Sequence, residues 1–332
     1  MSDTAYNDAL HDQFKDLSTS NFTVQFMPPV VFVCGGPMLP VYSSLRERIF
    51  TYTAINDEKL YESLVLAENF KDYFKDGAYS DLMQFEEDIA NISTLIVICL
   101  ESAGSLVELG LFVNRKSLAQ RLLVFAPSEE IEENKEKDIP ARSSFIYLGP
   151  LEHLKKLDSD SVAIYPWPVY GNSKYNEIDL VVHDLNSRLN SVRKSERFNP
   201  SNTGHIAILI FEVILLAEPI KLTEIEWVLL CMDIEVERSV VSRLLYLLGI
   251  MNLVTSMPYS GTDYYYAKNS KVSKIKFGKT KSGKIQDAPN MKISIRQSYM
   301  SMTGDNLDET AKKRRNVLSR ITDLRKEKEA EE

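Results

Sequence analysis

Short, wholly apolar runs recur through the first half of the chain, and they constrain the fold more than any other feature. The runs occupy residues 30–34, 64–67, 95–100, 122–126, 145–148 and 162–165. Short apolar runs bounded by turn-forming residues are typical of strands that are buried on both faces of a parallel sheet. Amphipathic helical patterns alternate with them, at residues 41–55, 79–92 and 173–195. Because strands and helices alternate, we predict an α/β fold with a doubly wound parallel sheet.

A different pattern begins after the turn-forming cluster at residues 198–203. Three closely spaced helical patterns cover residues 206–217, 222–231 and 234–248, and strand patterns at 252–257 and 264–268 flank Ser260 and Gly261. Three short helices followed by a hairpin predict a small winged helix-turn-helix domain. We therefore expect an α/β domain at residues 1–197, the winged-helix domain at 204–269 and a basic extension at 270–332. A winged-helix domain that only contacts protein is the alternative.

Basic and polar side chains favour nucleic acid as a partner of this second half. The polar face of the third helical pattern carries Arg238, Ser239, Ser242 and Arg243, which is the composition of a helix that reads a DNA groove. Residues 268–328 hold 17 Lys and Arg against 6 Asp and Glu, whereas residues 1–267 hold 22 against 38. A basic cluster that could bind phosphates consists of Lys312, Lys313, Arg314 and Arg315. The alternatives are a solvated tail, a tail that docks on the acidic body, and one that folds only on a partner.

Composition narrows the class of protein further. A chain of 332 residues with 44% hydrophobic content can bury two cores. The longest apolar run, residues 206–217, contains Glu212 and is too short for a bilayer, and the first residues are polar, unlike a signal peptide. We expect a cytoplasmic protein without membrane contact. Cys34, Cys99 and Cys231 lie in apolar surroundings without a CxxC pair, so we expect reduced thiols and no metal site.

The segment at residues 95–110 carries the most chemical information. A strand pattern runs into a loop of small residues, and a helix pattern follows. Ligands of doubly wound sheets bind beyond the carboxyl ends of the strands. Gly104 would allow close approach to the backbone, and the N–H groups of residues 105–107 could hold an anionic oxygen. Glu108 would then lie one turn into the helix, at the crevice. The same spacing also fits a capping box formed by Ser105 and Glu108.

Three sequence elements resemble the nucleoside deoxyribosyltransferase superfamily in order and spacing. They are Cys34-Gly35-Gly36-Pro37 after the first strand, the acidic helix at residues 85–92, and Ser102-x-Gly104-Ser105-x-x-Glu108-Leu-Gly110. Longer strings at residues 101–112, 144–150 and 238–244 resemble the effector (toxin) proteins of bacterial retrons. This resemblance covers most of the chain but not the tail. It implies an N-glycosidase domain of the nucleoside deoxyribosyltransferase type.

The superfamily resemblance implies a role for each matching residue. Glu108 would be the nucleophile that attacks the anomeric carbon of the sugar and displaces the base. An acidic residue of the preceding helix, Glu86 or Glu87, would orient the base or assist proton transfer, although the superfamily usually has Asp there. The residues that would contact substrate are Gly35, Gly36, Pro37, Ser102, Gly104 and Ser105. The two adjacent glycines also fit a simple turn that ends a strand.

The retron resemblance implies partners and a substrate. Retron effectors serve in anti-phage defence and are held inactive by a reverse transcriptase and its multicopy single-stranded DNA, an RNA-linked molecule. The implied substrate is NAD or a nucleotide, cleaved at its N-glycosidic bond without a cofactor. Nicotinamide leaves without protonation, so NAD cleavage needs a general acid less than purine release does. Two alternatives are a DNA-binding regulator with a nucleotide-sensing α/β domain and a nucleoside deoxyribosyltransferase. A homo-oligomer or filament is left open.

Overall fold

The computed structural model describes residues 4–66, 77–128, 146–268, 272–302 and 308–331. The chain divides into an α/β unit, residues 26–194, and a helical unit, residues 1–25 with 195–332. This division differs from the expected boundaries, because the first 25 residues and the C-terminal extension both fold with the helices that follow residue 203. Strand pairing accounts for the difference. β1 (Thr23–Gln25) lies between β7 (Ser195–Arg197) and β10 (Ile275–Lys276), antiparallel to both.

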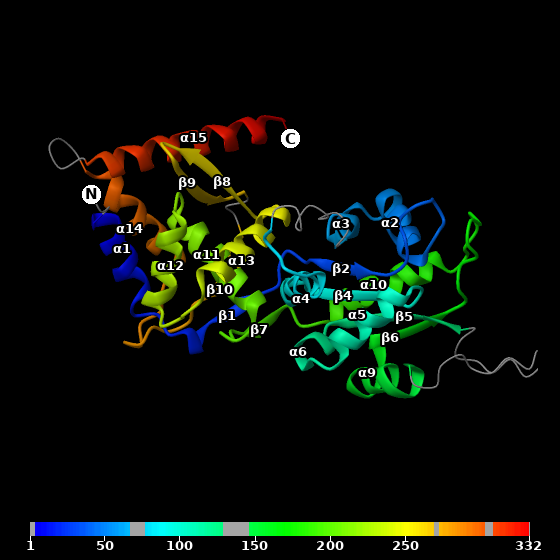
Figure 1. The fold of residues 1–332 in the computed structure, drawn as a ribbon. Coiled ribbons are helices and arrows are strands. Elements are labelled where there is room, and N and C mark those ends of the chain that lie inside the picture. Colours follow the sequence, from blue (N-terminus) through cyan, green and yellow to red (C-terminus); the bar gives the residue numbers. More distant parts are fainter. Residues whose placement is uncertain (1–3, 67–76, 129–145, 269–271, 303–307, 332) are drawn as a thin grey trace, which may run out of the picture. The chain divides into compact units, whose positions relative to one another are not determined.

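The α/β unit is built on a five-stranded parallel sheet with the order β3-β2-β4-β5-β6 (Figure 1). Its strands are Leu64–Val65 (β3), Val31–Cys34 (β2), Leu95–Cys99 (β4), Leu122–Pro127 (β5) and Val162–Tyr165 (β6). Every residue of β2, β4 and β5 is buried, as a continuous apolar sequence predicts for a strand covered on both faces. The predicted α/β fold with a parallel sheet is confirmed.

The apolar run at residues 145–148 does not form the expected strand. Tyr147–Leu151 forms a helical turn (η3) that continues directly into α9 (Glu152–Leu157), and Phe145 lies outside the described residues. A short apolar run has no period that separates a strand from a helical turn. The prediction was wrong because the run is continued by an amphipathic helix rather than ended by a turn.

Helices cover both faces of the sheet. On one face α2 (Leu45–Asn56), α3 (Glu58–Tyr61) and α10 (Ile178–Ser191) share a core with alternate residues of the strands, among them Val31 and Val33. On the other face the Phe112 ring of α5 (Ala103–Val113) meets the Phe32 ring of β2 edge to face, with centroids 6.5 Å apart. The described residues of this unit also form the helical elements α4 (Leu82–Ile92), α6 (Lys116–Ala119) and η4 (Ser159–Ser161).

The helical unit contains the predicted three helices and hairpin. The helices are α11 (Thr203–Ala217), α12 (Leu222–Cys231) and α13 (Arg238–Ile250), and the hairpin consists of β8 (Val254–Tyr259) and β9 (Thr262–Ala267). Ser260 and Gly261 both have positive φ, 53° and 77°, which a tight two-residue hairpin turn requires. Two N-terminal elements, α1 (Thr4–Phe14) and η1 (Thr19–Asn21), belong to the same unit.

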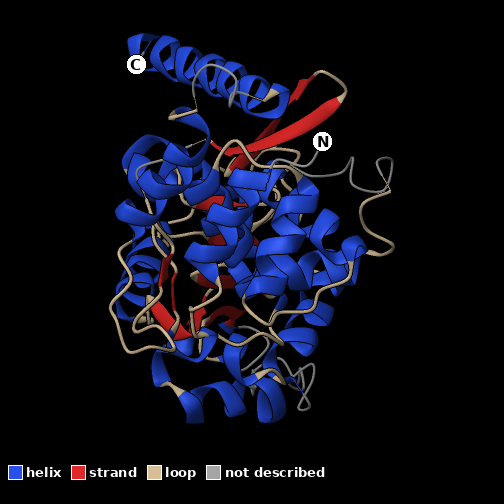
Figure 2. Cartoon of the chain, turned by 90° about the vertical axis from the view of Figure 1, so that its left-hand side faces the viewer, coloured by secondary structure: helices blue, strands red, loops and turns tan. Residues whose placement is uncertain are grey.

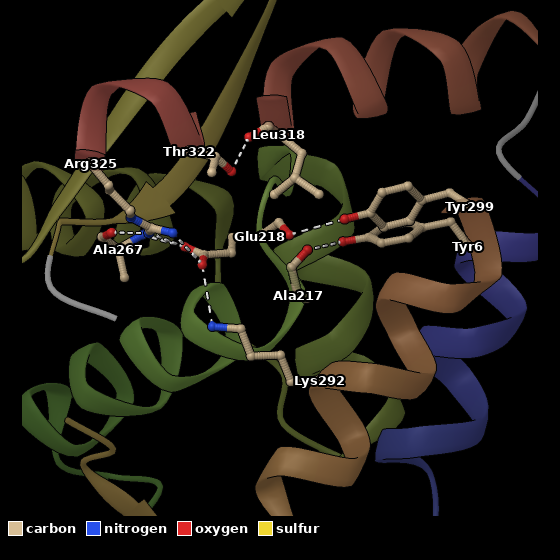
Figure 3. A network of polar contacts seen from close by, with 9 residues as sticks. All are labelled: Tyr6, Ala217, Glu218, Ala267, Lys292, Tyr299, Leu318, Thr322 and Arg325. Carbon is tan, nitrogen blue, oxygen red and sulfur yellow. Dashed lines mark hydrogen bonds and ion pairs between the residues drawn. The ribbon is translucent and has the colours of Figure 1, made fainter. Parts of the chain in front are cut away.

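The C-terminal extension folds back onto the helical unit through α14 (Ala288–Met300) and α15 (Glu309–Glu331). α15 lies along the β8–β9 hairpin (Figure 2), where Val317 and Ile321 pack against Tyr264. Figure 3 shows Arg325 of α15 and Lys292 of α14 converging on the buried carboxylate of Glu218. Arg325 donates to both carboxylate oxygens, at 2.9 and 2.7 Å, and Lys292 to one, at 3.3 Å. The described part of the extension is therefore docked on the protein itself.

Candidate functional site

The strand order places a topological switch point between β2 and β4. The chain passes from β2 to β3 at one edge of the sheet, whereas β4 leads through β5 to β6 at the other edge. Ligands of open α/β sheets bind beyond the carboxyl ends of the strands at such a point, because the connecting loops diverge there. The loop after β2 begins with Gly35 and Gly36, and the loop after β4 begins with Leu100 and Glu101.

The carboxylate of Glu101 fastens these two loops to the first turn of α2. Its Oε1 accepts hydrogen bonds from the N–H groups of Gly36 (2.7 Å) and Arg46 (3.2 Å), and Oε2 accepts one from Leu45 (2.7 Å). Burial raises the pKa of Glu101, and the three backbone donors oppose that rise. Glu101 was not among the site residues predicted from the sequence. The available signal was an acidic residue directly after a buried strand at the carboxyl edge of the sheet.

Gly35 and Gly36 make room for this carboxylate. A Cβ atom on Gly35 would lie 2.8 Å from Oε1 of Glu101, and one on Gly36 would lie 2.8 Å from Cβ of Ser44 and 3.0 Å from Cδ of Glu101. Neither glycine is among the residues with positive φ, so close packing rather than a special turn requires glycine here. Pro37, the third predicted residue of this loop, accepts hydrogen bonds through its carbonyl from the Ser43 and Ser44 hydroxyls (2.7 and 2.8 Å).

A capping box begins α5, but it is formed by other residues than expected. The Ser102 hydroxyl accepts from the N–H of Ser105 (3.1 Å), and the Ser105 hydroxyl accepts from the N–H of Ser102 (3.1 Å). The alternative that pairs Ser105 with Glu108 is therefore wrong. The N–H groups of Ser105 and Leu106 are also already bonded, to the Ser102 hydroxyl and carbonyl. Ser105 is buried, whereas Gly104 is exposed beside it.

Glu108 lies in the body of α5, and its carboxylate shares an environment with Glu86 of α4. Both residues are half-buried, and both act on the buried thiol of Cys34 at the carboxyl end of β2. Burial raises the pKa of Cys34 far above its usual value, and the charges of Glu108 and Glu86 raise it further. The thiol therefore keeps its proton and hydrogen-bonds the Glu108 side chain. Glu87, the other candidate on α4, forms an ion pair with Arg115 instead.

The charges of two carboxylates from different helices thus act on one thiol at the end of β2. Two carboxylates at one site can divide the acid and nucleophile roles of glycosidic cleavage. Burial raises the pKa values of Cys34, Cys99 and Glu101, and the charge of the buried Arg46 side chain opposes each of these rises. Glu108 and Glu86 thus act on Cys34, the residue directly before Gly35 and Gly36, and the Ser102 hydroxyl lies 3.3 Å from the Gly35 carbonyl.

The predicted nucleic-acid residues of α13 lie largely at the surface. Arg238, Ser239 and Ser242 are exposed, and Arg243 is half-buried. Arg238 lies 3.5 Å from Glu226 of α12 in an ion pair. The opposite face of α13 is apolar and buried, and it includes Val241, Leu244, Leu245 and Leu248.

The basic cluster of α15 is divided between the surface and the interior. Lys312 is exposed and Lys313 is half-buried. Arg314 is fully buried, pairs with Glu224 (2.6 Å), and lies 3.4 Å from the Tyr6 ring centroid. Its guanidinium therefore has no access to a phosphate. Arg315 donates to the Tyr299 carbonyl (2.7 Å) and to that of Met302, so half of the cluster serves the fold.

Three further expectations concern the cysteine thiols, metal binding and membrane contact. All three cysteines are free thiols; Cys34 and Cys99 are buried and Cys231 is partly so. Within the described ranges, His, Cys, Asp and Glu side chains do not gather into a group of three or more that could hold a metal ion. The helices described are each too short or too polar to cross a membrane.

Comparison with known proteins identifies relatives of this chain. The family described as "STM3845 retron effector protein" matches residues 42–256. An Escherichia coli protein named "Retron Ec86 putative ribosyltransferase/DNA-binding protein" is 29% identical over 133 residues. The alignment spans 40% of this chain and 39% of that protein, so the chain matches well under two thirds of its relative's length.

Proposed function

This chain belongs to the family of STM3845 retron effector proteins, and on that premise we propose that it is an N-glycosidase effector of anti-phage defence. The proposed substrate is NAD or a nucleotide, and Glu108 is the proposed nucleophile. The observation that carries the proposal is that Glu108 lies on the helix that follows β4 at the switch point of the sheet, where its charge and that of Glu86 both act on the Cys34 thiol. The name of the Escherichia coli relative, which contains the words ribosyltransferase and DNA-binding, agrees with it.

In the proposed reaction the Glu108 carboxylate attacks the anomeric carbon of the ribose. The C–N bond to the base breaks as the C–O bond to Glu108 forms, which gives a glycosyl ester. Water then attacks the same carbon and releases free Glu108, with Glu86 accepting the proton of that water. Nicotinamide leaves as a neutral base, so Glu86 need not protonate it. The Cys34 thiol hydrogen-bonds Glu108 and orients its carboxylate.

We assign the nucleic-acid partner to the helical unit. In this proposal α11, α12, α13 and the β8–β9 hairpin form a winged helix-turn-helix, and the exposed Arg238, Ser239 and Ser242 face the multicopy single-stranded DNA. The retron reverse transcriptase and this DNA hold the effector inactive until infection. The α/β unit is proposed to be of the nucleoside deoxyribosyltransferase type, as its parallel sheet and the Glu108 motif suggest.

Exchange of Glu108 for Gln tests the glycosidase. Purified wild type and Glu108→Gln are incubated with NAD, nucleotides and nucleosides, and products are identified by mass spectrometry. We expect the variant to lose about 10³-fold or more of the turnover, because Gln keeps the shape but is not a nucleophile. Glu58→Gln, an exposed acid-to-amide change on α3, is the control and retains full activity. Equal turnover by wild type and Glu108→Gln would contradict the proposal.

A second pair of variants separates Glu86 from Glu87. Because Glu87 pairs with Arg115 and Glu86 acts on Cys34, Glu86→Gln slows turnover while Glu87→Gln leaves it close to wild type. The slowing is about 10²-fold or more for purine release, which needs a general acid, and smaller for NAD. A larger effect of Glu87→Gln would reverse this assignment. Formation of a new nucleoside in the presence of free base would instead identify a transferase.

The exposed basic face of α13 favours a second candidate, a DNA-binding regulator whose α/β unit only senses a nucleotide. Specific binding to duplex DNA that Arg238→Ala abolishes, without turnover of any nucleotide, is the result that this candidate requires. The proposed effector is instead expected to bind single-stranded retron DNA and to have N-glycosidase activity.

A further inference from the structure

A cavity lies in the α/β unit, and its walls contain none of Glu86, Glu108 and Cys34. Its volume is about 190 Å³, and its walls come from the loop after β2, from α2, from the loop after β6 and from the start of α10. Its residues include Glu47, Arg48, Tyr42, Tyr52 and Tyr175. Since a cavity of about 150 Å³ accommodates benzene, this volume suits one planar ring system rather than a whole dinucleotide.

Arg48 holds two walls of this cavity together. Its guanidinium donates to the carbonyls of Tyr42 (3.4 Å), Val169 (3.2 Å) and Asn172 (2.5 Å). It also lies over the rings of Tyr42 and Tyr175, 5.3 and 5.8 Å from their centroids. Because this side chain is buried and makes five contacts at once, the two aromatic walls are fixed before any ligand arrives.

The backbone of Tyr42 is held in a conformation that side chains rarely adopt. Its φ is 65°, which is costly for a bulky residue. Two hydrogen bonds maintain it: the Tyr42 N–H donates to Oε2 of Glu47 (2.8 Å), and its carbonyl accepts from Gly171 (3.0 Å). Strained residues held in this way cluster at ligand-binding sites. The strain places the Tyr42 ring at the cavity wall.

Glu47 supplies the polar recognition group. Its side chain is 3% exposed, and its two oxygens accept from the Tyr42 N–H and the Thr51 hydroxyl (2.7 Å). A carboxylate offers about four acceptor positions, and these two hydrogen bonds use two of them. Because Glu47 lines the cavity, a ligand that it would recognise presents N–H groups at the edge of a planar ring.

We propose that this cavity binds the base of a small nucleoside or nucleotide whose ring carries an exocyclic amine, as adenine and cytosine do. Tyrosine walls contact the ring, and the Glu47 carboxylate accepts from the amine. The oxo bases hypoxanthine and uracil present a carbonyl at that position, which the carboxylate repels. The proposal does not rest on glycosidase activity, because none of the cavity residues has a role in the proposed reaction.

Binding of paired nucleosides tests this site. Adenosine, inosine, cytidine and uridine are titrated calorimetrically into the full chain carrying Glu108→Gln, which lacks the proposed nucleophile, and chromatography of each nucleoside after the titration verifies that it is intact. We expect at least one amino nucleoside to bind with a Kd below about 1 mM. Its oxo counterpart is expected to bind about tenfold or more weakly, because a site built for a hydrogen bond rejects the analogue that cannot form it.

Four variants locate the binding. Glu47→Gln is expected to remove the preference for the amine, whereas the matched surface change Glu58→Gln keeps it. Tyr175→Leu weakens the binding of amino and oxo nucleosides alike, whereas Tyr175→Phe leaves the binding of both unchanged. Thermal unfolding verifies each fold; if Glu47→Gln is unfolded, the two Tyr175 variants decide. Affinities that are unchanged in Tyr175→Leu, or absence of any preference for the amine, would overturn the proposal.

Discussion

At the scale of single residues, the site depends on one buried carboxylate and two glycines that accommodate it. Glu101 draws the loop after β2 and the first turn of α2 together through three backbone hydrogen bonds. Those bonds form only because Gly35 and Gly36 lack side chains. The glycine pair was predictable from the sequence, but the reason for it was not, because Glu101 and Gly36 are 65 residues apart and periodicity reports only local structure.

Two glycine substitutions with opposite expected signs test this packing. Gly36→Ala places a methyl group 2.8 Å from Ser44, and overpacking of this kind lowers the free energy of unfolding by about 1–3 kcal/mol. Gly110 lies inside α5 with open space around its Cβ position, so Gly110→Ala raises that free energy by up to about 1 kcal/mol. Urea unfolding measures both. Equal effects of the two substitutions would exclude the packing explanation.

Lys274 provides a pH-dependent prediction within the helical unit. Burial lowers the pKa of Lys274 from 10.5 to about 8. Between these values the unfolded chain holds more protons at this site than the folded one, so its contribution to stability grows as the pH rises. We expect wild type to gain stability relative to Lys274→Met between pH 8 and pH 10.5. Urea unfolding at both ends of the window checks this, and a constant difference would show an unperturbed lysine.

At the scale of elements, predictability follows the local pattern. The strands β2, β4 and β5 were foreseeable because they are apolar throughout, and the hairpin was foreseeable from Ser260 and Gly261 between two strand patterns. β10 has two residues and exists only through its pairing with β1. α14 likewise has just three buried residues along its length. Such elements depend on distant partners, so their own sequences identify them poorly.

The basic cluster of α15 predicted a nucleic-acid surface, but Arg314 in that cluster is buried. We expect Arg314→Met to lower the free energy of unfolding by about 3–5 kcal/mol, because Glu224 loses a buried partner. The matched change Lys312→Met removes only an exposed pair with Glu309 and changes stability by less than about 0.5 kcal/mol. Chemical unfolding of both variants gives the comparison. A small effect at Arg314 would mean that α15 contributes little to the stability of the unit.

At the scale of the whole molecule, the helical unit joins residues 1–25 to residues 195–332. The pattern of apolar and polar residues changes near residue 200, and the domain boundary expected from the sequence followed that change. No sequence pattern indicated that the N-terminal segment would cross to the other unit, because the information lies in the pairing of β1 with β7 and β10. The difference in charge between residues 1–267 and residues 268–328 is also a property of the whole molecule. It remains at the surface although Arg314 is buried, because Lys312 is exposed and Lys313 is half-buried.

Salt dependence measures how this charge contributes to nucleic-acid binding. Each phosphate contact with single-stranded DNA adds about 0.7 to the negative slope of log K against log salt concentration. If Lys312 and Lys313 contact phosphates, replacing both with Gln reduces the slope by about 1.4. Lys155 and Lys156 are an adjacent exposed pair on α9 of the other unit, and their replacement by Gln is the matched control, which leaves the slope unchanged. Fluorescence anisotropy from low to physiological salt provides the slopes. Equal slopes for both double variants would show that Lys312 and Lys313 of α15 contact no phosphates, and would leave α13 as the nucleic-acid interface.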